Sequence, residues 1–385
     1  MPQDSTRVDL VPAAFVSYPV TMSGTSPDPI PVTRGLLSSW IDSGELLGAY
    51  VFVSHQGRPV ADVAIGECAP ERAARNSDVG RLYCGVKPFV AVCLARAVQD
   101  GMVEFTTPVH ELVDVPNTGR WKAVDIRGLL THSSGLWPSH DNPYLFSFES
   151  YLEMIKRDEK RPARWAAQPI YNTTVAWHLL AAVAENLFRQ PVDAVVKEVV
   201  ARPIAADTLS LVHPSADNFA PLHVRAPSAA FQELADAPLG ELFSRPNPAH
   251  GGFSRNSDVG RFYGDLLDCL SGDGVLLESG VAKELTRQHA TLNEGSRQQH
   301  EWGLGFELAV APRYFGVEWG TGSFGHSGAI GDVTQSPPRV FFVSLADPES
   351  GLVLSVRLAS VDARSGWRLA RLGRSLTTDL VDYLA

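Results

Sequence analysis

A thiol and an amine stand three positions apart in the segment LYCGVKPFVAV, which runs from Leu82 to Val92. Cys84 and Lys87 would face the same side of a helix that begins here. The positive end of the helix dipole and a neighbouring ammonium both favour the thiolate, which is the nucleophilic form of cysteine. A desolvated, neutral Lys87 would instead accept the thiol proton. The pair predicts a nucleophile with its base; the alternative is a buried cysteine beside a surface lysine.

The segments around Cys84 predict a rigid setting for it. Residues 34–44 carry apolar side chains at helical spacing and end at glycine, which predicts a helix. Residues 48–67 form two β-rich runs around the turn HQGRP, which is typical of a hairpin. Residues 88–100 are strongly apolar at helical spacing, so they predict a buried helix with Cys84 at its N-terminal edge.

The rest of the chain divides into a helical middle and a β-rich end. Residues 105–290 alternate helical segments with loops rich in proline and glycine, and clear strands are rare. Residues 339–360 return to strands around a turn, and residues 364–385 form a closing helix. This order predicts an α/β fold, an antiparallel sheet flanked by terminal helices with a largely helical insertion. We expect one region from residues 1–104 and 291–385, a second from 105–290, and the active-site cleft between them.

Several motifs in order resemble those of the serine β-lactamase and penicillin-binding-protein superfamily, specifically its class C β-lactamase and esterase branch. That family opens a buried helix with S-x-x-K, and here Cys84 takes the place of the serine while Lys87 is kept. The segment VDIRGLLTHSSGLWP is similar to the family's ITIRHLLTHTSGL. The resemblance covers roughly residues 40–360 and implies the β-lactamase/transpeptidase-like fold.

The segment YNTTVAWHLLAAVAE is similar to the family's Y-x-N loop and the helix after it. The resemblance implies that Tyr171 is the phenol that shares a proton with Lys87 and serves the leaving group. The family's asparagine falls on Thr173, which lacks the second hydrogen-bonding arm of an amide, and Asn172 should point elsewhere. This departure argues against recognition of a substrate amide carbonyl, and with it against β-lactam binding.

The segment FGHSGAIGDV resembles the third family motif, which is K-T-G in β-lactamases and H-x-G in esterase-like relatives. His326, Ser327 and Gly328 occupy it. The resemblance implies that these residues let a strand backbone lie against the acyl group. The backbone amides of Ala329 and Cys84 would then form the oxyanion hole.

Other residues with reactive side chains have structural interpretations. His250, in a segment that resembles the family's GG-hydrophobic-S/T-x-x-D segment bordering the site, is expected to be structural. His132 and Ser134 are expected to hold a loop by hydrogen bonds. Cys93 and Cys269 are expected in the core, and Cys68 in a loop without a basic neighbour.

Composition restricts the partners and cofactors. The net charge of −10 argues against nucleic acid or an anionic membrane surface as a partner. No apolar run reaches the length of a membrane span, and no signal peptide is evident, so we expect a cytoplasmic protein. The four cysteines form no CxxC pair and the eleven histidines no HExxH motif, so neither a metal nor another cofactor is expected.

A cysteine nucleophile points to acyl transfer. Thiolates attack esters and thioesters well, whereas an amide nitrogen is harder to expel than the thiolate itself. The resulting thioester reacts with amines in preference to water. We therefore expect a transacylase that takes an acyl group from an ester or thioester to an amine or alcohol, in natural-product (antibiotic) biosynthesis. An esterase-type hydrolase, a non-catalytic binding homologue and a Cys84 that replaces a natural serine are the alternatives.

Overall fold

The computed structural model describes residues 28–136, 168–214, 216–225, 230–234, 246–294, 298–330 and 339–384. Its helices are α1 (Pro31–Asp42), α2 (Lys87–Gln99), α3 (Ile126–Leu130), α5 (Val175–Phe188), α6 (Val192–Val196), α8 (Asn256–Ser271), α9 (Ser279–Thr286) and α10 (Ser365–Leu384). The strands are β1 (Gly48–His55), β2 (Arg58–Ala69), β3 (Arg72–Ala73), β4 (Val79–Tyr83), β5 (Phe219–Ala220), β6 (His223–Val224), β7 (Gln232–Glu233), β8 (Gly252–Ser254), β9 (Ala290–Glu294), β10 (Gln298–Trp302), β11 (Glu307–Leu308), β12 (Phe324–Ile330), β13 (Arg339–Asp347), β14 (Leu352–Leu358) and β15 (Ser360–Val361).

A nine-stranded sheet forms the centre of the molecule, in the order β3-β2-β1-β14-β13-β12-β11-β10-β9, and every neighbouring pair in it is antiparallel. The predicted hairpin is β1 and β2, joined through Gln56 and Gly57 with φ of 48° and 75°. Two successive positive φ values are typical of the tight turn that matches strand twist. The predicted strands of residues 339–360 are β13 and β14, and β14 pairs with β1. The two ends of the chain therefore meet in the middle of the sheet.

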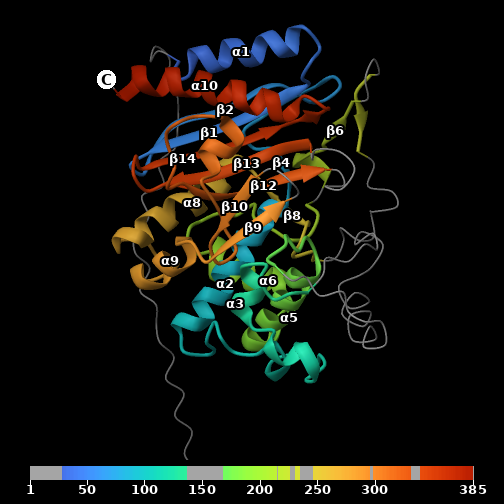
Figure 1. Cartoon of the computed structure of the whole chain (residues 1–385). Coiled ribbons are helices and arrows are strands. Elements are labelled where there is room, and N and C mark those ends of the chain that lie inside the picture. Colours follow the sequence, from blue (N-terminus) through green and yellow to red (C-terminus); the bar gives the residue numbers. More distant parts are fainter. Residues whose placement is uncertain are drawn as a thin grey trace, which may run out of the picture.

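Helices α1 and α10 lie together on one side of this sheet, as Figure 1 shows. The Asp379 carboxylate of α10 accepts hydrogen bonds from the backbone amides of Val32 and Thr33 at 2.9 and 2.8 Å. An acceptor at these amides satisfies donors that the first turn of a helix cannot satisfy itself. The predicted terminal helices that flank the sheet are thus confirmed.

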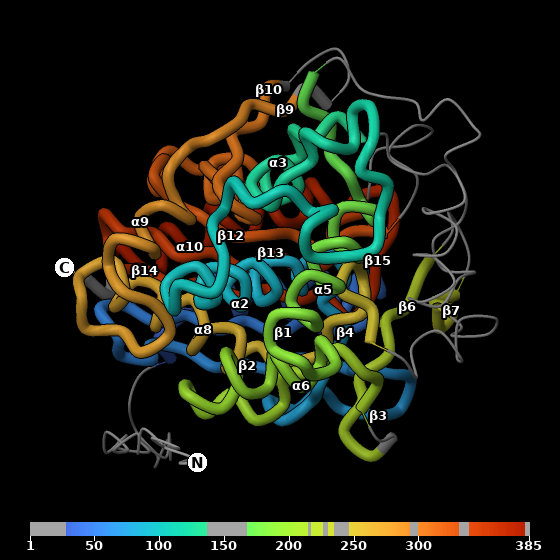
Figure 2. Tube along the Cα trace, turned by 90° about the horizontal axis from the view of Figure 1, so that it is seen from below, coloured from blue at the N-terminus to red at the C-terminus, as the bar shows by residue number. Residues whose placement is uncertain are grey.

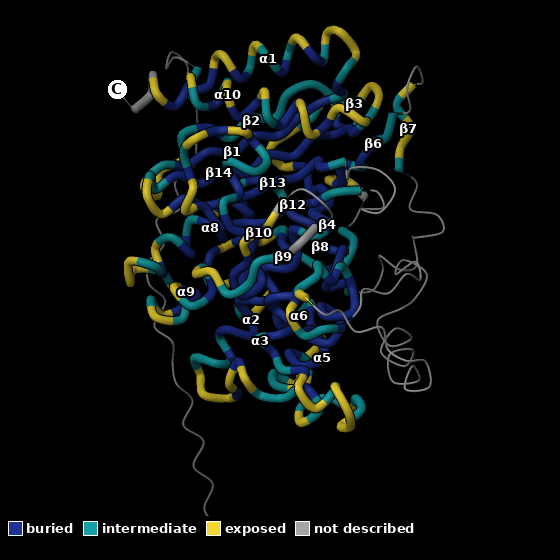
Figure 3. Tube along the Cα trace, viewed as in Figure 1, coloured by how far each residue is buried: buried dark blue, intermediate teal, exposed yellow. Residues whose placement is uncertain are grey.

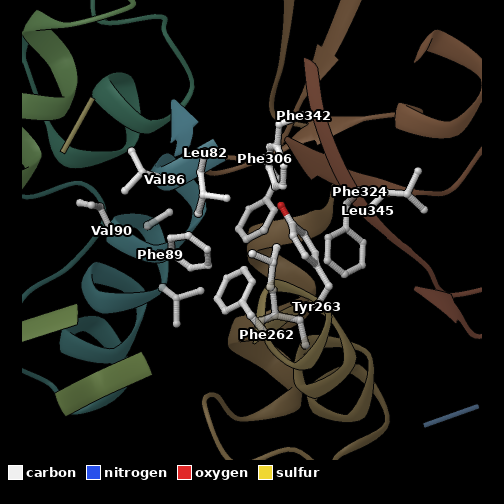
Figure 4. Close-up of a cluster of buried hydrophobic side chains, with 14 of the residues drawn as sticks. Leu82, Val86, Phe89, Val90, Phe262, Tyr263, Phe306, Phe324, Phe342 and Leu345 are labelled. Carbon is white, nitrogen blue, oxygen red and sulfur yellow. The ribbon is translucent and has the colours of Figure 1, made fainter. Parts of the chain in front are cut away.

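The remaining helices cover the other face, where α2, α5 and α6 lie in front of the sheet when it is seen from below (Figure 2). Helix α2 is buried along nearly its whole length, as its unbroken apolar sequence predicts. Buried segments run through the sheet and the central helices, whereas exposed positions gather on outer turns (Figure 3). Phe89 of α2 packs edge to face on Phe262 of α8, with ring centroids 4.5 Å apart (Figure 4). This core holds the beginning of α2 against the sheet.

The antiparallel sheet flanked by terminal helices is the α/β arrangement that the sequence predicts. The sequence did not predict β9, β10 and β11, which extend the sheet beyond β12. The segment QQHEW of β10 is polar, so it lacks the apolar runs that mark a strand. Strand β4, which leads to Cys84, pairs with β5 and β8 from the predicted helical region. None of the helices in the described ranges is long and apolar enough to cross a membrane.

Candidate active site

Cys84 stands at the point where β4 ends and a helix begins. Tyr83 bends the chain there with φ 48° and ψ −126°, a conformation that costs roughly 1–3 kcal/mol for a residue with a side chain. The ring of Tyr83 is buried edge to face against Phe341, which holds the bend. A 3-10 turn, Cys84–Val86, then continues into α2. The half-buried thiol therefore lies at the N-terminal end of a helix, where the dipole favours its anion.

Lys87 is completely buried beneath this turn. Its Nζ donates a hydrogen bond to the carbonyl oxygen of Ala249 at 2.7 Å. The same nitrogen lies 5.6 Å from the ring centre of Tyr171 and 5.7 Å from that of Trp177. Burial lowers the pKa of Lys87, while the charge of Cys84 acts in the opposite direction. The amine of Lys87 therefore lies beside the thiol of Cys84 and gives up its own proton more readily than an exposed lysine does.

The surroundings of Cys84 favour its ionised form. Burial raises the pKa of the thiol, but the charges of Lys87 and His326 lower it. Hydrogen bonds from Tyr171 and Lys87 to the sulfur lower it further, and the net pKa is below that of an ordinary cysteine. The structure therefore brings Lys87, Tyr171 and His326 together around the sulfur atom of Cys84.

Tyr171 is positioned by aromatic neighbours. Its ring centroid lies 4.7 Å from that of His132 and 5.4 Å from that of Trp302. The Nδ1 atom of His132 accepts a hydrogen bond from the amide of Asn172 at 3.1 Å, so His132 holds the loop as predicted. The side-chain amide of Asn172 donates to the carbonyl of Leu136 and, as predicted, points elsewhere.

Two threonines follow Asn172. The hydroxyl of Thr173, the predicted substrate contact, lies 3.3 Å from that of Thr174. Thr173 is half-buried, whereas Thr174 is only 2% exposed. A role for Thr173 in binding substrate stays a prediction.

The predicted third motif lies on β12, next to the chain that leads to Cys84. A Cβ added to Gly328 would lie 2.3 Å from the carbonyl oxygen of Leu82, so β12 and the chain before Cys84 touch through their backbones. The pairing of β12 with β13 shifts register between Gly328 and Ala329. Such bulges change the direction of backbone groups beside active sites. An oxyanion hole formed by the amides of Ala329 and Cys84 stays a prediction.

A buried carboxylate that we did not single out from the sequence supports β12. Glu307 is 3% exposed and accepts hydrogen bonds from the backbone amide and hydroxyl of Ser327 at 3.0 and 2.9 Å, and from Tyr314 at 2.6 Å. Burial raises the pKa of Glu307, but the charges of His326, His300 and Arg313 and the hydrogen bond from Tyr314 together lower it to about 2. The sequence indicates Glu307 only as a single acidic residue within the apolar segment WGLGFELAV.

Glu307 also fixes His326. The Nδ1 atom of His326 lies 2.8 Å from the carbonyl of Ser327 and 3.2 Å from Oε1 of Glu307, and both are acceptors. Nδ1 must therefore carry the proton. Within the ranges that the structure describes, the buried Nε2 of His326 has no hydrogen-bond partner. Burial lowers the pKa of His326, while the charge of Glu307 raises it.

His250 was expected to be structural, and this interpretation missed its contact with Cys84. Its Nδ1 atom lies 3.5 Å from Sγ of Cys84. The sequence signal was a histidine directly before the glycine pair of HGGFS.

The prediction that Cys68 lies in a loop without a basic neighbour is wrong. Cys68 lies in β2, and Nε of Arg72 is 2.7 Å from its sulfur. Cys93 and Cys269 are buried in the core, as predicted.

The model of the Beta-lactamase family matches residues 34–372, and the chain belongs to this family. The esterase EstB of Burkholderia gladioli is 26% identical over 328 residues, which cover 73% of this chain and 82% of EstB. Among solved structures, EstCE1, a hydrolase with promiscuous acyltransferase activity, superposes with a TM-score of 0.71 at 16% identity, over 90% of this chain and 98% of EstCE1. A penicillin-binding protein homologue from Caulobacter crescentus gives a TM-score of 0.70 at 20% identity, over 93% and 99% of the two chains.

The family assignment confirms the resemblance of the motifs at the level of the superfamily. Membership of the class C and esterase branch, and the exchange of the family's serine for Cys84, stay predictions. Among the described residues, no group of three or more histidine, cysteine, aspartate or glutamate side chains could hold a metal ion.

Proposed function

We propose that this chain is an acyl-transfer enzyme in which Cys84 takes the acyl group of an ester or thioester and passes it to an amine or hydroxyl acceptor. One observation carries this proposal. The half-buried thiol of Cys84 stands at a helix N-terminus beside the completely buried amine of Lys87; burial raises the pKa of the thiol, but the charges of Lys87 and His326 lower it overall. A site that served only binding would gain nothing from a buried amine beside a thiol, since burying the amine is costly.

The proposed reaction has two halves. The Cys84 thiolate attacks the acyl carbon, its proton being held by Lys87, and the leaving oxygen or sulfur takes the proton of Tyr171 as its bond to carbon breaks. The acceptor then attacks the thioester and gives its proton to the Tyr171 phenolate. The C–S bond breaks and the thiolate is restored. The amides of Ala329 and Cys84 would stabilise the oxyanion in both halves.

The chemistry of sulfur favours transfer over hydrolysis. A thioester reacts readily with amines, which need less base assistance than water does. Amide substrates are disfavoured because a thiolate leaves the tetrahedral adduct more easily than an amide nitrogen. Thr173 in place of the family's asparagine supports the same choice, since a hydroxyl offers less to a substrate amide. A role in natural-product biosynthesis stays a prediction.

Ester hydrolysis is the second candidate. The similarity to EstB, an esterase, favours it, and EstCE1 is described as a hydrolase that also transfers acyl groups. The two candidates share the acyl-enzyme and differ only in the acceptor that resolves it.

Intact-mass spectrometry with an activated ester tests the proposal. We expect a single acyl adduct that peptide mapping places on Cys84, and no adduct in Cys84→Ala. Adding a primary amine should replace free acid by amide as the main product. Labelling of Cys93 or Cys269 in the folded protein would contradict the assignment of the nucleophile. Acid as the product at every amine concentration would favour the hydrolase.

A further inference from the structure

His250 reaches the sulfur of Cys84 from a segment that the proposed mechanism does not use. Its Nδ1 lies 3.5 Å from Sγ, and the side chain is buried, with 6% exposed. The Asn247 side chain holds the turn that carries it, because Oδ1 accepts hydrogen bonds from the amides of Ala249 and His250 at 3.0 and 2.9 Å. The carbonyl of Ala249 in the same turn receives the hydrogen bond from Lys87. One turn therefore anchors the amine and presents an imidazole to the thiol.

The other nitrogen of the His250 ring is held as well. Nε2 lies 3.3 Å from the hydroxyl of Thr174, whose amide donates to Oδ1 of Asn172. The ring is thus fixed between Cys84 and Thr174. This arrangement allows one orientation of the imidazole plane toward the sulfur.

The charges around the ring decide its protonation. Burial lowers the pKa of His250 well below its usual value, and the charge of Lys87 lowers it further. His178 faces Thr174 from the same side, with Nδ1 3.0 Å from the carbonyl of Thr174, and burial lowers its pKa to about 4. The imidazole of His250 is therefore neutral at pH 7 and carries one N–H.

Tyr171 and His326 also act on the sulfur, and Nδ1 of His326 lies 3.2 Å from Oε1 of Glu307. Lys87 is the group that can hold the thiol proton. When the neutral imidazole carries its proton on Nδ1, this N–H can donate a hydrogen bond to the thiolate sulfur. The unprotonated Nε2 then accepts a hydrogen bond from the Thr174 hydroxyl.

We propose that His250 is a catalytic residue whose Nδ1–H donates a hydrogen bond to the Cys84 thiolate and so increases the fraction of reactive sulfur. The inference rests on the proposed function in that Cys84 is the nucleophile. Sulfur is larger than oxygen and its bond to carbon is longer. A serine hydroxyl at this position would lie farther from Nδ1, beyond hydrogen-bond range. His250 is therefore matched to a thiol and not to the family's serine.

Alkylation of Cys84 by iodoacetamide in the full-length protein tests this directly, with the site of labelling read by peptide mapping. The rate is measured from about pH 5 to about pH 10 for wild type, His250→Asn and the control His178→Asn. His178 is another buried histidine, whose Nδ1 lies 3.0 Å from the carbonyl oxygen of Thr174. We expect His250→Asn to raise the apparent pKa of Cys84 by about one unit, so that alkylation slows about tenfold at pH values below the wild-type midpoint and little above the shifted one. The control should follow the wild-type profile, and a His250→Asn profile that also follows it would overturn the proposal.

A second measurement leaves His250 intact. The ring nitrogen shifts of His250, followed by NMR in wild type, should change as Cys84 ionises, at the midpoint of the wild-type alkylation profile, and should not change there in Cys84→Ala. Ring shifts that do not respond to ionisation of Cys84 in wild type would overturn the proposal even if the His250 variants do not fold. The two proposals fail separately. If no ester or thioester acylates Cys84 while the alkylation profile shifts, the proposed function is wrong and the role of His250 stands. If esters acylate Cys84 and the profile does not shift, only the role of His250 is wrong.

Discussion

Replacing Gly328 with alanine tests whether β12 must touch the chain that leads to the nucleophile. The new Cβ would lie 2.3 Å from the carbonyl oxygen of Leu82, where ordinary contacts begin at 3.4 Å. It would also lie 3.2 Å from Cβ of Phe342. Because the nearest atom belongs to the backbone, no side-chain rotation relieves the clash, and β12 must move from Leu82 by about 1 Å.

This displacement should affect catalysis more than folding. Overpacking of this kind costs roughly 1–3 kcal/mol of stability. A shift of about 1 Å in a positioning element, or loss of one oxyanion-hole donor, costs on the order of 10²-fold in rate. We therefore expect Gly328→Ala to fold and to acylate Cys84 about a hundredfold more slowly.

Stopped-flow acylation by a chromogenic ester, with thermal unfolding of the same samples, measures both effects. Gly322→Ala is the matched control, because it adds the same methyl group before β12 where no heavy atom lies within 4 Å. An acylation rate like that of wild type in Gly328→Ala, with a clearly lowered melting temperature, would refute the reasoning. The strand would then have accommodated the methyl group without moving the site.

Three further predictions concern the groups around the sulfur. Lys87→Ala and Tyr171→Phe should each slow transfer from an ester with a poor leaving group by about 10²–10⁴-fold in steady-state rate. The double variant should be only slightly slower than either single variant, because the two residues act as one unit. Near wild-type rates in both single variants would contradict a shared proton path. Cys84→Ser should keep acylation if the site accepts oxygen and should move the products toward acid, measured by chromatography with an amine present. Glu307→Gln removes the charge that raises the pKa of His326, so NMR titration should find that pKa lowered further. An unchanged pKa would show that the charge of Glu307 does not influence the protonation of His326.

Local order along the chain was sufficient to predict several elements. Apolar spacing predicts α1 and α2, and alternation around a turn predicts the β1–β2 hairpin, because these patterns depend on neighbours in sequence. The placement of Cys84 one helical turn before Lys87 follows from helix geometry alone. Tyr171 and His326 needed the resemblance to a family, since nothing near them in the chain indicates a partner.

Only the tertiary structure decided which distant groups share the site. Glu307 contacts His326 because β11 pairs with β12 in the sheet, and His250 contacts Cys84 because β8 pairs with β4. Neither pairing leaves a periodic signal in the sequence, since each strand involved is short or bends at the site. Burial, which moves the pKa values of Lys87 and His250, is likewise a property of the assembled core. The sequence by itself determined the helix that begins beside Cys84 and predicted Cys84 as the nucleophile, whereas the charged groups around its sulfur come from segments that meet only on folding.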